Sequence, residues 1–211
     1  MMSGVERDRV LHLYDDGVDA FAAAAGDLSA DDWERVACGE WTATDLVRHV
    51  LAVAGWYHGW LDRAECGDAS PPFGVSGLAA QNAEALRALS GLGGPEAMAQ
   101  FVARARAYCD RLPAQWDVPY GYPRGTVTAG LHAAVAACEW HLHTWDLAHV
   151  LGRGHRPPDA VSLYAATGAC SAAAEGGLKG RVAEVLIPLG THLRPWEAIL
   201  RRSGRAPGPD D

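Results

Sequence analysis

The chain has 211 residues, of which 49% are apolar and 21% are charged, a composition typical of a folded domain with a core. Its formal net charge of −8 argues against a nucleic-acid partner, because binding to phosphates requires a basic surface. No apolar run is long enough to cross a bilayer, and the charged N-terminus has no signal core behind it. We therefore expect a cytoplasmic protein with no nucleic-acid or membrane partner.

The pattern of cysteines also favours a cytoplasmic location. They are odd in number, scattered, and never form a C-x-x-C pair, which indicates small buried thiols in a reducing cytosol rather than a disulfide framework. They are Cys38, Cys66, Cys109, Cys138 and Cys170.

Helical spacing of apolar residues runs through most of the chain. Val10, Leu13, Tyr14, Val18 and Phe21 mark one face of a first helix over residues 5–26. The next helix, over 42–64, has the clearest start signal. Thr42 is its expected N-cap, Asp45 stands at the capping-box position, and Trp41 and Leu46 can form a hydrophobic staple.

Two more helical regions follow. One covers 77–112 and is interrupted at 91–95 by a Gly-rich stretch that ends in a proline. An extended aromatic connector is expected over 116–125, and another long helix over 126–151. Four long helices predict an all-α four-helix bundle, an architecture that commonly builds metal sites from facing core side chains.

The C-terminal part is less regular. We expect a helix over 158–176, a short extended segment over 182–188 and a last helix over 194–202. The predicted organisation is therefore a bundle over residues 1–155, a helical appendage packed on it over 156–203, and a flexible tail over 204–211.

The main candidate site lies on two of the bundle helices. Glu139 and His143 are four residues apart, which places them about 40° apart and one turn along a helix. His49, on a separately capped helix, can supply a third ligand. Two imidazoles and one carboxylate with open coordination positions are typical of a catalytic metal centre. The helix of Glu139 is too apolar for a solvated surface, and a buried carboxylate is costly unless it is paired or bound to a metal.

A purely structural interpretation remains open, in which Glu139 pairs with an arginine and both histidines are satisfied core residues. His132 lies seven residues before Glu139, about 10 Å along the helix, too far for the same ion; it lines a pocket or meets solvent. Asp146, one turn past His143, can orient a ligating imidazole, or pair with an arginine or a backbone group near the helix end.

Two motifs together carry a family resemblance. A Trp-Thr-x-x-Asp-Leu-Val-x-His run at 41–49 and a Glu-x-x-x-His-Thr-Trp-Asp-Leu-Ala run at 139–148 resemble the DinB/YfiT-like superfamily of metal-binding four-helix bundles. Within it, the chain is most similar to the mycothiol-dependent maleylpyruvate isomerase N-terminal domain group, over residues 5–152. Residues 190–207 also resemble the short tail of small actinobacterial members, which ends in a Gly-Arg-x-Pro signature.

The resemblance implies that His49, Glu139 and His143 are metal ligands and the catalytic centre. It implies zinc, or another divalent ion such as Ni²⁺ or Fe²⁺, with mycothiol as co-substrate. It does not extend to the full C-terminal domain that supplies substrate-binding residues in the isomerase, so it does not imply maleylpyruvate as the substrate.

The resemblance therefore implies an enzyme of the S-transferase or isomerase type, in which a zinc-bound thiolate attacks a small electrophile. Its partners are a small-molecule substrate and a low-molecular-weight thiol, and it is a monomer or a homodimer. Three alternatives stay open: a non-catalytic, metal-stabilised ligand-binding bundle, Fe(II) oxygen chemistry, and zinc-hydroxide hydrolysis.

Overall fold

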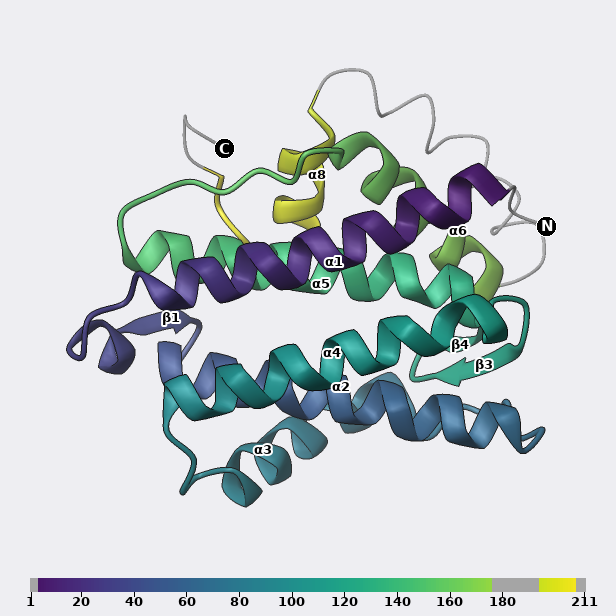
Figure 1. Cartoon of the computed structure of the whole chain (residues 1–211), viewed down its shortest axis with the longest axis horizontal. Helices are drawn as coiled ribbons and strands as arrows, with labels where there is room; N and C mark the ends of the chain where they lie inside the picture. Colours follow the sequence, from purple (N-terminus) through teal and green to yellow (C-terminus); the bar gives the residue numbers. More distant parts are fainter. Residues whose placement is uncertain (1–3, 176–193, 208–211) are drawn as a thin grey trace.

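A computed structural model describes residues 4–175 and 194–207. It is mainly helical, and the predicted four-helix bundle is confirmed. Figure 1 shows the bundle as two pairs of helices, with α1 beside α5 and α4 beside α2. The bundle helices are α1 (Gly4–Gly26), α2 (Ala43–Glu65), α4 (Gly94–Gln115) and α5 (Ala129–Val150).

The start of α2 follows the predicted capping pattern. The backbone N–H of Asp45 donates to Thr42 Oγ1 over 3.1 Å, and the Thr42 hydroxyl donates to the Asp45 carboxylate over 3.1 Å. These contacts satisfy a backbone donor that the first helical turn leaves free. They fix the register of α2, and therefore the direction in which His49 projects.

Two small antiparallel hairpins flank the bundle. β1 (Val36–Cys38) pairs with β2 (Trp41–Thr42), and β3 (Pro119–Tyr122) pairs with β4 (Gly125–Thr128). The second hairpin replaces the extended connector expected over 116–125, and its strand β4 takes the residues at which the last long helix was expected to start. That helix, α5, begins at Ala129, where Thr128 accepts a hydrogen bond from the Leu131 N–H.

The interrupted helical region is also as predicted. It forms a short helix α3 (Leu78–Ala88), which packs on α2, and then α4. Two single turns, η1 (Asp32–Glu34) and η2 (Val75–Gly77), precede α2 and α3. No helix in the described ranges is long and apolar enough to cross a membrane.

Aromatic side chains fill the bundle interior. The Trp140 ring, fully buried, contacts Tyr14 and Phe101 in edge-to-face geometry with ring centroids 5.9 and 5.0 Å apart. Phe21 adds a further edge-to-face contact to Phe101. The apolar face predicted for the first helix is buried throughout: Val10, Leu13, Tyr14, Val18 and Phe21.

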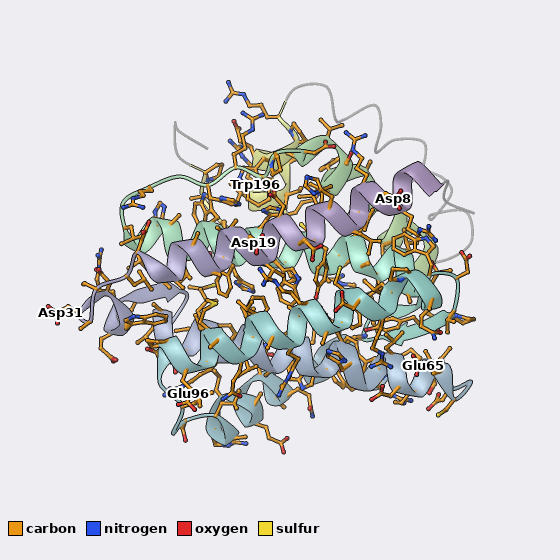
Figure 2. The ribbon with its side chains drawn as sticks, in the orientation of Figure 1. Asp8, Asp19, Asp31, Glu65, Glu96 and Trp196 are labelled. Carbon is orange, nitrogen blue, oxygen red and sulfur yellow. The ribbon has the colours of Figure 1, made fainter. Side chains whose placement is uncertain are left out.

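The C-terminal part covers α5. Helix α6 (Ala160–Glu175) packs on α5, and α8 (Pro195–Arg202) packs on α6. Trp196, in the first turn of α8, is buried and is labelled in Figure 2. Its indole N–H donates to the His155 carbonyl over 2.7 Å. The expected extended segment at 182–188 lies outside the described residues. Because α5 is enclosed by α1, α2, α4 and α6, polar side chains on most of its faces are buried.

Candidate metal centre

Helices α2 and α5 bring the three candidate ligands together. The rings of His49 and His143 meet edge to face, with centroids 5.4 Å apart, and both residues are buried. Glu139 stands one turn before His143 and keeps 39% of its side-chain surface exposed. Of the three candidates, Glu139 is therefore the one that solvent reaches. By contrast, the labelled carboxylates Asp31 and Glu65 lie at opposite ends of the molecule (Figure 2).

His143 lies between two carboxylates. Its Nε2 is 3.5 Å from Glu139 Oε2, and its Nδ1 is 2.9 Å from Asp146 Oδ2. Burial alone lowers the pKa of an imidazole, but the hydrogen bonds to Asp146 and Glu139 outweigh it and raise the pKa of His143. A carboxylate only accepts, so Nδ1–H donates to Asp146 and Nε2 is the nitrogen directed at Glu139.

Asp146 is itself held by an arginine from far along the chain. Arg205 Nε donates to Oδ1 over 2.7 Å and Nη2 donates to Oδ2 over 2.5 Å, with 11% and 2% of the two side chains exposed. Burial raises the pKa of Asp146, but the bonds to His143 and Arg205 prevail and lower it. Asp146 is thus a carboxylate with both oxygens engaged. The sequence suggested an imidazole partner or an arginine partner for it, and the structure has both.

His49 is held as a neutral imidazole. Burial first, and then the nearby His143, lower the pKa of His49 to about 3. Its Nδ1 is buried without a full hydrogen bond, although the Asn82 side chain interacts with the imidazole and works against this lowering of the pKa. The ring packs against Trp41 with centroids 4.6 Å apart. A neutral imidazole is the form that binds metal ions, and a buried nitrogen without a full hydrogen bond is costly unless something binds it.

The pairwise spacings match those of ligands around one ion. Two donors about 2.1 Å from a tetrahedral ion lie about 3.4 Å apart, close to the 3.5 Å between Glu139 and His143. Two imidazole rings on such an ion have centres about 5 Å apart, close to the 5.4 Å between His49 and His143. Even so, no three His, Cys, Asp or Glu side chains in the described part of the chain converge closely enough to hold an ion as they stand. The donor types and the pairwise spacings fit a divalent cation, but the three side chains do not all lie within ligand distance of one common point.

Cys38 joins this neighbourhood and was not singled out in the sequence. It lies on β1, which packs against α5. Burial, with the nearby carboxylate of Asp146, raises the pKa of Cys38 to about 11. The thiol therefore stays protonated at neutral pH, which makes it a poor nucleophile. Only the hairpin places Cys38 beside α5, and the sequence offered no signal for that packing.

His132 has a different environment from the one expected. It does not meet solvent: it is 1% exposed, its Nδ1 has no hydrogen-bond partner, and aromatic rings enclose it. The nearest are Tyr120 and Tyr57, with centroids 4.5 and 4.7 Å away. Burial lowers the pKa of His132 to about 3.

The comparisons with known proteins give one result. Residues 14–148 match the family described as mycothiol maleylpyruvate isomerase N-terminal domain. Neither the curated proteins nor the solved structures yielded a match. The matched range includes α2, α5 and all three candidate ligands, and leaves Arg205 outside. With well over half of its length matched, the chain belongs to the mycothiol maleylpyruvate isomerase N-terminal domain family.

Proposed function

We propose that the chain is a metal-dependent enzyme that uses a low-molecular-weight thiol, mycothiol by its family, to attack a small electrophile. His49, Glu139 and His143 would hold the ion. The observation that carries this proposal is the position of His143, with Nδ1 bonded to a buried carboxylate and Nε2 directed at the carboxylate of Glu139. This is the arrangement in which metal-ligating histidines are usually oriented.

The protein's own contribution is a set of prepared donors. His49 is kept neutral by burial, and His143 is oriented by Asp146. Because its two carboxylate partners raise the pKa of His143, Nε2 would give up the proton that it shares with Glu139 on binding an ion. Burial raises the pKa of Glu139, but the hydrogen bond from His143 and the charges around it lower the pKa overall, so Glu139 is ionised. Its partial exposure leaves this side of the cluster open to a small molecule.

Zinc is the expected ion, since two imidazoles and a carboxylate suit it. A bound divalent cation supplies the positive charge that keeps a coordinated thiol ionised at neutral pH. Two outcomes suit such a thiolate. It displaces a leaving group, forming a C–S bond while the leaving group departs with its electron pair. Alternatively it adds to a conjugated double bond, which rotates as a single bond before the same thiolate is expelled.

The test is metal content followed by thiol-dependent turnover. Untagged protein is analysed by mass spectrometry beside His49→Ala, Glu139→Ala and His143→Ala, with His149→Ala as the matched control, since His149 is exposed on the same helix. We expect about one zinc per chain in the parent and the control, and its loss in the three variants. Zinc-loaded parent should then consume thiol with model electrophiles. Metal that survives all three changes would remove the proposed site.

One observation favours a second candidate function, which involves no catalysis. His143 is already compensated by Glu139 and Asp146 without an ion, so the cluster can serve as a buried ionic network in a non-catalytic, ligand-binding bundle. That function predicts no bound metal and no thiol consumption. It also predicts that Glu139→Gln destabilises the chain whether or not zinc is present.

A further inference from the structure

The route by which Arg205 reaches Asp146 is built into the end of α8. The Gly204 N–H donates to the Arg201 carbonyl, and the Arg205 N–H donates to the Leu200 carbonyl over 2.9 Å. These are the two bonds of a Schellman motif, and Gly204 takes the required left-handed conformation at φ +81°. The glycine therefore ends the helix and turns the chain so that the next residue, Arg205, is directed back toward α5.

The contact that results is a buried, two-pronged ion pair. Arg205 engages both oxygens of Asp146, and one of those oxygens also accepts the Nδ1–H of His143. An arginine fork fixes the plane of the carboxylate that it binds. The orientation of Asp146 then fixes the ring of His143, and with it the direction of Nε2.

We propose that Arg205 is a positioning residue of the metal centre: through Asp146 it orients His143, so that the C-terminal segment beyond the family-matched region completes the site. The inference rests on the proposed function for its metal readout. It goes further by making the appendage, 59 residues from Asp146 in sequence, part of the catalytic unit. It also gives the Gly-Arg pair at 204–205 a physical role, with the glycine setting the turn and the arginine making the contact.

A simpler interpretation is that this ion pair only fastens the appendage to the bundle. Two variants separate the roles. Trp196→Phe removes the bond from Trp196 to the His155 carbonyl, loosening α8 without touching Asp146. Arg201→Gln changes an exposed arginine on α8 that pairs with Glu197, and is the matched control for loss of a positive charge.

The experiment measures zinc affinity by competition with a chromophoric chelator, on the full chain, for the parent, Arg205→Gln, Arg205→Lys and both control variants. We expect Arg205→Gln to weaken zinc binding by about 10- to 100-fold and Arg205→Lys by less, because a lysine keeps the charge but not the fork. Arg201→Gln and Trp196→Phe should bind zinc like the parent. Zinc binding by folded Arg205→Gln equal to that of the parent overturns the proposal.

A second readout does not depend on metal. In the metal-free chain, the His143 Nδ1–H held by Asp146 should give a slowly exchanging low-field proton signal, assigned by its loss in His143→Gln. Arg205→Gln should lose this signal, and Arg201→Gln should keep it. Absence of zinc binding in the parent, with this pattern intact, would reject the proposed function and leave the positioning role standing. Absence of the signal in the parent, or its persistence in Arg205→Gln, would reject the positioning role.

Discussion

His132 should make the bundle sensitive to mild acid. Its pKa is about 3 in the folded chain because it is enclosed by aromatic rings, against about 6.5 when unfolded. A folded-state pKa below the unfolded value means that stability is fully present above pH 6.5 and is lost as the pH falls toward 3. Each pH unit within that window corresponds to about 1.4 kcal/mol. At pH 6.5 His132 is already half protonated in the unfolded chain, so lowering the pH from 6.5 to 4.5 should remove about 2 kcal/mol of unfolding free energy through His132 alone.

The variant that isolates this effect is His132→Phe, which keeps a ring and removes a nitrogen without a hydrogen-bond partner. Urea unfolding followed by tryptophan fluorescence at pH 6.5, 5.5 and 4.5 gives the free energy for the parent and the variant. We expect the variant to lose about 2 kcal/mol less than the parent over this range, while exposed His12→Gln behaves like the parent. Equal losses in the parent and His132→Phe would refute the reasoning.

Two further predictions test the packing that positions the site. A Cβ at Gly121 would run into the backbone of Ser70, so Gly121→Ala should lower the free energy of unfolding by about 3 kcal/mol. Gly59→Ala in α2, where a Cβ meets nothing, should raise it by about 1 kcal/mol; equal effects at the two glycines would contradict this packing. Phe101→Ala, which empties a fully buried position against Trp140, should cost about 3 to 5 kcal/mol in the same assay, and a loss below about 1 kcal/mol would contradict it.

The helices of the bundle were predictable because their signals are local. Each of these signals depends on residues within one or two turns of the helix: the cap at Thr42, the apolar face of α1, and the interruption between α3 and α4. The β3–β4 hairpin was missed because its residues read only as an extended connector. As a result, the predicted start of the last bundle helix was wrong: it was placed at residue 126, and α5 begins at Ala129.

The candidate ligands could be selected from sequence, but their supports could not. Helical spacing alone puts Glu139, His143 and Asp146 on neighbouring turns. Arg205 and Cys38 reach the same place through packing of the appendage and of β1, and such long-range contacts leave no periodic signal. The tail over 204–211 was expected to be flexible on composition, which gave no hint that Arg205 is a partner of Asp146.

The central claim is that His49, Glu139 and His143 bind one metal ion. Crystals of the zinc-loaded chain, measured on both sides of the zinc absorption edge, test it most directly. We expect one anomalous peak about 2.1 Å from a nitrogen of His49, from His143 Nε2 and from a carboxylate oxygen of Glu139. A zinc-saturated crystal with no peak there, or with its peak on other side chains, would contradict it.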